Sequence, residues 1–98
     1  MEARTLTARP TTAETVNVLR SVHRLTGAEC YWLSGRFHFP LGGGWSLAVS
    51  PDDAGRFRLD ACLHTRTRDT LWVRPGDDVR LERVVNGLGR EIESLEAV

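Results

Sequence analysis

The large apolar residues between positions 31 and 73 fall almost without exception on odd-numbered positions. The polar residues between them are mostly even-numbered. Side chains alternate between the two sides of a β-strand, so this period of two predicts a sheet with one apolar face and one polar face. The odd-numbered apolar residues are Tyr31, Leu33, Phe37, Phe39, Leu41, Trp45, Leu47, Val49, Phe57, Leu59, Leu63, Leu71 and Val73.

Helical patterns flank this central segment. Residues 11–14 read Thr-Thr-Ala-Glu, a capping-box pattern, and Gly27 is a typical helix stop, so we expect a helix that ends near Thr26. A second helix is expected from Asp77 or Asp78, with apolar residues at helical spacing. Gly87 lies inside it, which leaves open a break at this position. The apolar positions of the second helix are Leu81, Val84, Val85, Leu88, Ile92 and Leu95.

The segment between the helices predicts four strands joined by short loops. Consecutive strands with short connections form an antiparallel meander. We therefore predict the α+β fold class, in the order α-β-β-β-β-α, with both helices on the odd-numbered face and the even-numbered face open. The expected strands cover residues 30–39, 45–50, 56–64 and 70–74.

Length and composition predict one small domain. The 98 residues suffice for a single core, and we expect a flexible N-terminal arm over 1–10 and one α+β domain over 11–98. Thirteen basic and thirteen acidic residues give zero net charge, which argues against a general polyanion binder. All thirteen basic residues are Arg, a bias that a GC-rich genome explains.

The chain is expected to be cytoplasmic, without membrane contact. No apolar run approaches the roughly 20 residues of a membrane helix, and residues 1–6 lack the apolar core of a secretion signal. Cys30 and Cys62 lie on expected strands that are too far apart for a disulfide, and free thiols fit a reducing compartment.

Candidates for catalysis and metal binding are weak. The expected register places His38, Ser46, Asp60 and Arg74 in one row, but a triad needs His between Ser and Asp. We expect ordinary pairing there, especially between Asp60 and Arg74. No close pair of Cys or His has zinc-site spacing, and the glycines at 42–44 join strand to strand without the Lys of a phosphate loop. We therefore predict no catalytic, cofactor-binding or metal-binding residue, and no cofactor.

Two tryptophans break the alternation, because Trp32 and Trp72 fall on the even-numbered face. Trp and Arg are the residues most enriched at binding hot spots. If these side chains are exposed on an open sheet face, they form a partner-binding surface. If instead a loop or the N-terminal arm folds over the indoles, the face carries no such surface. The predicted partner-binding residues are Trp32, Arg36, Arg56, Arg58, Trp72 and Arg74.

The leading functional prediction is a non-catalytic protein–protein interaction or adaptor module, homodimeric and binding through the open sheet face. Nucleic-acid binding by the same Arg and Trp residues is the alternative, since they also stack on and neutralise single strands. A small enzyme is the third hypothesis. The helix–sheet–helix order is similar to that of double-stranded RNA-binding domains, but Asp77 and Asp78 stand where those domains carry Lys. No family is assigned.

Overall fold

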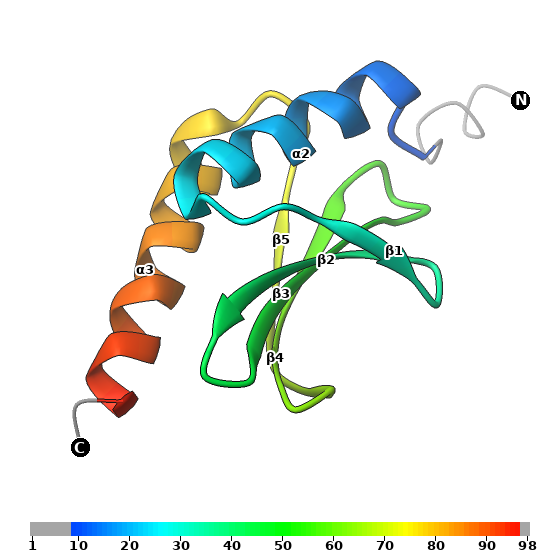
Figure 1. The fold of residues 1–98 in the computed structure, drawn as a ribbon. Coiled ribbons are helices and arrows are strands. Elements are labelled where there is room, and N and C mark those ends of the chain that lie inside the picture. Colours follow the sequence, from blue (N-terminus) through cyan, green and yellow to red (C-terminus); the bar gives the residue numbers. More distant parts are fainter. Residues whose placement is uncertain (1–8, 97–98) are drawn as a thin grey trace, which may run out of the picture.

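The computed structural model describes the backbone of residues 9–96 and the side chains of residues 9–92 (Figure 1). Its five strands form one antiparallel sheet in the order β1-β2-β3-β4-β5, so the class is α+β as predicted, with five strands instead of four. The elements in chain order are α2 (Thr12–Thr26), β1 (Tyr31–Leu33), β2 (Arg36–Gly42), β3 (Trp45–Pro51), β4 (Phe57–Leu63), β5 (Arg66–Val73) and α3 (Asp78–Glu96).

The additional strand arises from a hairpin where the sequence predicts one strand over 30–39. Ser34 and Gly35 have φ values of 53° and 79°, and Leu33 pairs directly with Arg36. Two-residue turns with both φ values positive match the twist of antiparallel strands. An odd-numbered residue of β1 therefore pairs with an even-numbered residue of β2. As a result, the odd-numbered residues of β1 lie on the same side of the sheet as the even-numbered residues of β2.

The predicted register of the other hairpins is wrong. The ladder of β5 includes residues 66–69, which the sequence assigns to a loop, because this edge segment is polar and carries no apolar alternation. Register shifts near Leu41 and Arg68 displace the pairing further. The observed pairs are Phe39 with Leu47, Ser50 with Arg58, and Asp60 with Thr70, where the sequence predicts Phe39 with Trp45, Ser50 with Arg56, and His64 with Thr70.

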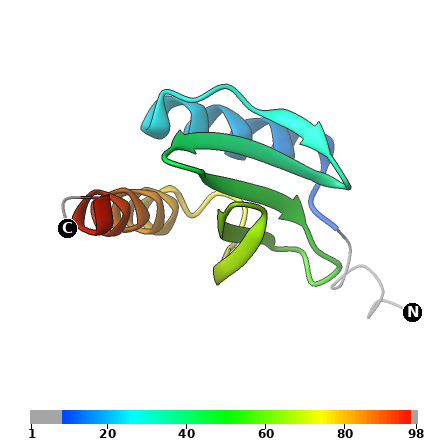
Figure 2. The ribbon, with the colours of Figure 1, turned by 60° about the horizontal axis from the view of Figure 1, so that its bottom comes forward.

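The core lies between the odd-numbered side of β2–β5 and the two helices (Figures 1 and 2). Val18 and Val22 of α2 join Leu81, Val84 and Leu88 of α3 in one buried cluster with the strands. Apolar burial of this kind is the main source of stability in a small domain. The strand residues in the cluster are Phe39, Leu47, Val49, Phe57, Leu59, Ala61 and Val73.

Helix α2 begins with the predicted capping box. The Glu14 amide donates to the Thr11 hydroxyl at 3.1 Å, and the Thr11 amide donates to the Glu14 carboxylate at 2.8 Å. Gly27 follows the helix with φ of 73°, and its amide donates to the His23 carbonyl at 2.7 Å. Residues 1–8 of the predicted arm lie outside the part of the chain that the structure describes. Arg9 donates to the Pro51 carbonyl at 3.0 Å.

Helix α3 passes through Gly87 without a break. An added Cβ at Gly87 has no neighbour within 4 Å. We therefore expect Gly87→Ala to raise the free energy of unfolding by about 0.5–1 kcal/mol, because Ala loses less backbone entropy in a helix. Chemical denaturation measures this change.

Gly44→Ala is the matched control for that substitution. Gly44 has φ of +85°, and a Cβ there would overlap the His64 ring. Gly44→Ala is therefore expected to lower the free energy of unfolding. A lower stability of Gly87→Ala would contradict an uninterrupted α3.

Within residues 9–96, neither helix combines the length and hydrophobicity needed to cross a bilayer.

Candidate partner-binding face

The side of the sheet opposite the core carries no helix among residues 9–96, and we call it the helix-free face (Figure 2). Five successive cross-strand partners form its central row: Tyr31, His38, Ala48, Asp60 and Thr70. Ala48 is the smallest of them and lies on the middle strand. Its short side chain lets groups on β2 and β4 meet above it. Arg36 of β2 thus reaches Asp60 of β4, with 2.9 Å between Nη1 and Oδ2.

Asp60 organises this face. Its carboxylate is fully buried and accepts hydrogen bonds from Arg36, from Arg58 Nε at 3.0 Å and from the Thr70 hydroxyl at 2.6 Å. A buried carboxylate is tolerated only when it is paired in this way. The prediction that Asp60 pairs with Arg74 is wrong. Thr70 is the cross-strand partner of Asp60 on β5, and the two guanidinium groups that bind Asp60 belong to Arg36 of β2 and Arg58 of β4.

The two guanidinium groups remain accessible. The Arg36 side chain is 30% exposed and the Arg58 side chain 48% exposed. Each guanidinium has five N–H donors, of which Asp60 takes one, so most donors remain for a partner. Asp60 therefore holds the guanidinium groups of Arg36 and Arg58 in defined positions at the surface.

His38 is buried in this row and packs against its neighbours. It is 8% exposed, the Tyr31 ring stacks on it at 5.3 Å between centroids, and its Nε2 lies 3.2 Å from the Leu33 carbonyl. Ser46 pairs with Cys62, away from His38. The predicted row of His38, Ser46, Asp60 and Arg74 is thus wrong, because the strands of each hairpin pair in a register that differs from the predicted one.

Trp72 of β5 lies beside Arg58, its cross-strand partner, and is 39% exposed. The Arg56 guanidinium covers its ring at 5.1 Å from the centroid, a cation–π contact. Arg56 is in turn bound to the Asp52 carboxylate, at 3.1 Å from Nη2. The indole is thereby held in place while part of its surface stays accessible.

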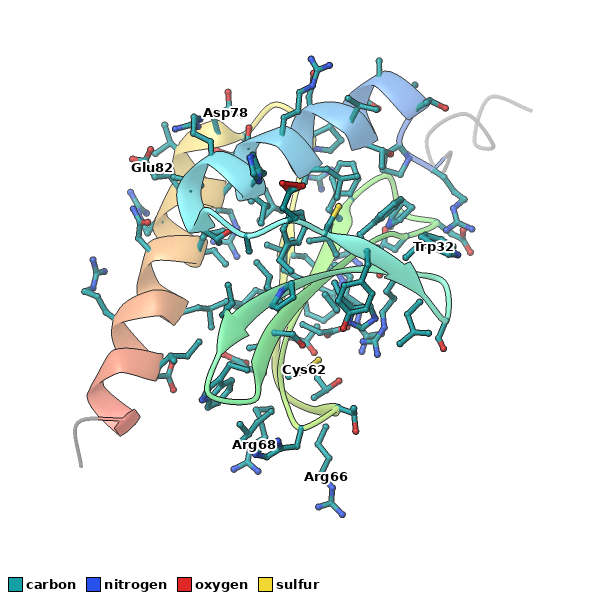
Figure 3. The ribbon with its side chains drawn as sticks, viewed as in Figure 1. Trp32, Cys62, Arg66, Arg68, Asp78 and Glu82 are labelled. Atoms are coloured by element: carbon teal, nitrogen blue, oxygen red, sulfur yellow. The ribbon has the colours of Figure 1, made fainter. Side chains whose placement is uncertain are left out.

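Trp32 lies on the other side of the sheet from Trp72, contrary to the sequence prediction. It pairs with Phe37 and packs edge-on against that ring at 4.7 Å, with 60% of the residue exposed (Figure 3). Tyr31 and Leu33, which are 49% and 54% exposed, occupy the helix-free face instead. The Ser34-Gly35 turn is the cause, and Gly35 was the only sequence signal for it.

Of the six predicted partner-binding residues, the structure brings together Arg36, Arg58 and Trp72, with Arg56 on the indole. Arg74 follows β5 and lies at its end. Sequence reasoning missed Tyr31, Leu33 and Asp60. Among residues 9–92, no cluster of three or more side chains suits a metal ion.

Charged side chains lie at both ends of the molecule. Arg66 and Arg68 project from the tip of the β4–β5 hairpin, whereas Asp78 and Glu82 lie on the first turns of α3, far from that tip (Figure 3). The first turns of α3 also carry Arg80 and Arg83, so the charge there is mixed in sign.

Asp52, which binds Arg56 beside Trp72, gives the stability of the fold a pH dependence. Burial raises the pKa of Asp52, but hydrogen bonds from the Arg56 and Ala54 amides and the Arg56 guanidinium outweigh it and hold the pKa below its ordinary value. A depressed pKa in the folded state stabilises the fold above about pH 4, and this contribution is lost as the pH falls through the folded-state pKa. Thermal unfolding should show a smaller loss of stability on acidification in Asp52→Asn than in the wild type. Equal losses would contradict the assignment.

Comparisons with known proteins add no relative. No protein-family model matches the chain, and searches of curated proteins and of solved structures found no match.

Proposed function

We propose that this protein is a non-catalytic protein–protein interaction module that forms a homodimer through its helix-free face. One observation carries the proposal. Exposed Tyr31, Leu33 and Trp72 share that face with two guanidinium groups held by the buried carboxylate of Asp60. The exposed thiol of Cys30 suits a reducing compartment such as the cytoplasm.

The composition of this surface supports the proposal. Tyr, Trp and Arg contribute most to binding energy at protein interfaces, and anchors of this kind lose little side-chain entropy when they are already held in place. Tyr31 stacks on His38, Arg58 is bound to Asp60, and Trp72 is covered by Arg56. The face is thus preorganised for contact.

The two sheet edges support a second copy as the partner. The β5 edge carries Arg66, Arg68 and Asp69, and a register shift disturbs it, features that discourage strand pairing. The β1 edge has the sequence Tyr-Trp-Leu, with no charge and with all three residues exposed. A two-fold axis through the helix-free face, close to β1, would bring Tyr31 and Leu33 of the two copies together, while Trp32 faces the opposite side of the sheet.

Sedimentation equilibrium of the wild-type protein tests the proposal. We expect a reversible monomer–dimer equilibrium with a dissociation constant in the range of about 1–100 µM. A single monomeric species at every concentration up to about 500 µM would contradict homodimerisation.

Nucleic-acid binding is the second candidate, and the cation–π pair of Arg56 and Trp72 beside Arg58 favours it. Arg and Trp together can stack on and neutralise a single strand. This hypothesis predicts affinity that falls steeply with salt. Fluorescence anisotropy of labelled single-stranded and double-stranded oligonucleotides at two salt concentrations separates it from the dimer, and flat titrations would exclude it.

A further inference from the structure

A hollow of about 380 Å³ lies where β5 ends and α3 begins. It is lined by Arg56, Trp72, Arg74, Asp77 and Arg80. Three of these five residues carry a guanidinium group, although the three come from separate segments of the chain. Arg56 also covers Trp72 of the helix-free face, but Arg74 and Arg80 have no role in the proposed self-association.

Two of the three guanidinium groups are held by the protein. Arg56 is bound to Asp52 and covers the Trp72 ring, and Arg80 Nε donates to the Trp72 carbonyl at 2.9 Å. Within residues 9–92, the Arg74 side chain has no hydrogen bond or ion pair to a protein group. Arg74 is therefore available to a ligand, beside two cations whose positions are already set.

The charges at the hollow favour an anion. The three guanidinium groups are opposed by two carboxylates, of which Asp52 is bound to Arg56 and Asp77 lines the hollow. The sum is one net positive charge from three Arg and two Asp. The Asp77 carboxylate accepts a hydrogen bond of 3.1 Å from the Arg80 amide and so caps the start of α3. The attraction for an anion therefore comes from the guanidinium groups and not from the helix terminus.

We propose that this hollow binds the phosphate group of a small phosphorylated ligand or free phosphate. Like charges gathered at one place repel each other, and a dianion between them removes that repulsion. A planar guanidinium fork matches two oxygens of a phosphate, which makes Arg the side chain best suited to this group. Arg74 closes on the anion, while Arg56 and Arg80 provide the fixed donors.

Tryptophan fluorescence can report on the site directly, because Trp72 lines the hollow. Titration with sodium phosphate at constant ionic strength, with chloride as the balancing anion, should give a saturable change. The change should be absent in Trp72→Phe, which retains Trp32 and Trp45. Isothermal calorimetry on the same protein measures binding without the indole signal.

Substitution of the charged groups tests the assignment. Arg74→Gln should weaken phosphate binding at least about tenfold, since it removes charge-assisted hydrogen bonds, which are stronger than bonds between neutral groups. Arg83→Gln, an exposed arginine of α3 outside the hollow, should leave the affinity unchanged. Phosphoserine serves as the second ligand: equal or tighter binding than phosphate indicates a phosphate monoester, and binding of phosphate alone indicates the free anion.

Failure of this proposal is separable from failure of the dimer. Arg74→Gln should dimerise as the wild type does, because Arg74 follows the end of β5 and has no cross-strand partner on the helix-free face. The proposal is overturned if phosphate causes no saturable heat or fluorescence change up to about 20 mM. Equal weakening by Arg74→Gln and Arg83→Gln would also overturn it, because it would show a general charge effect.

Discussion

Asp60→Ala is expected to lower the free energy of unfolding by about 3 kcal/mol, a large fraction of the stability of a domain this size. The substitution removes the acceptor for Arg36, Arg58 and Thr70 and leaves a space in a fully buried position. The two guanidinium groups can turn to solvent, which keeps the loss at the lower end for a broken buried pair. Urea denaturation followed by tryptophan fluorescence measures this loss of free energy. In a separate thermal unfolding experiment, the melting temperature should fall by about 12–24 °C.

Asp53→Ala is the matched control. The Asp53 side chain is 88% exposed, and its ion pair with Arg9 spans 3.7 Å, so the expected loss is below about 0.5 kcal/mol. A double-mutant cycle between Asp60 and Arg36 should give a coupling energy of about 1–2 kcal/mol, since they are in direct contact. A loss below about 1 kcal/mol in Asp60→Ala would contradict the organising role of this carboxylate.

The double variant Tyr31→Ala/Trp72→Ala is expected to weaken self-association at least about hundredfold. Both residues lie on the helix-free face, and truncation of two aromatic anchors removes apolar contact that the remaining Arg groups cannot replace. Sedimentation equilibrium measures the dissociation constant. Circular dichroism and the unfolding midpoint establish that the variant remains folded.

Trp32→Ala is the control for this variant. Trp32 is more exposed than Trp72 but lies on the opposite side of the sheet. Its removal should change the dissociation constant less than about threefold. Equal effects of Trp32→Ala and Trp72→Ala would contradict recognition by one face.

Over β2–β5 the alternation of apolar residues predicted the core, although Tyr31 and Leu33, which follow the same pattern, lie on the helix-free face. Phe39, Leu47, Phe57 and Leu59 are all buried on one side, as a period of two requires. The capping box at Thr11 was also readable, because its two hydrogen bonds involve residues three positions apart. These features depend on local sequence and burial alone.

The side on which Trp32 lies could not be predicted in this way. It depends on Ser34, whose positive φ of 53° is uncommon for a residue other than Gly and has no strong sequence signal. Once Ser34 and Gly35 form a two-residue turn, β1 pairs with opposite parity and Tyr31 replaces Trp32 on the helix-free face. A single turn residue thus changed which indole belongs to the candidate site.

The role of Asp60 was hidden for a different reason. An acidic residue at an even position indicates a solvent-facing side chain, whereas Asp60 is fully buried. Its burial depends on the register that places Ala48 opposite both His38 and Asp60, and Thr70 on the other side of Asp60. Long-range pairing of this kind cannot be read from spacing along the chain.

The location of the contact surface is tested most directly by amide NMR spectra of the wild-type protein, recorded from about 10 to 500 µM. We expect concentration-dependent shifts to cluster at Tyr31, Leu33, Arg36, Arg58 and Trp72. Shifts confined to the outer side of α3, or spectra that do not change with concentration, would contradict an interaction surface on the helix-free side of the sheet.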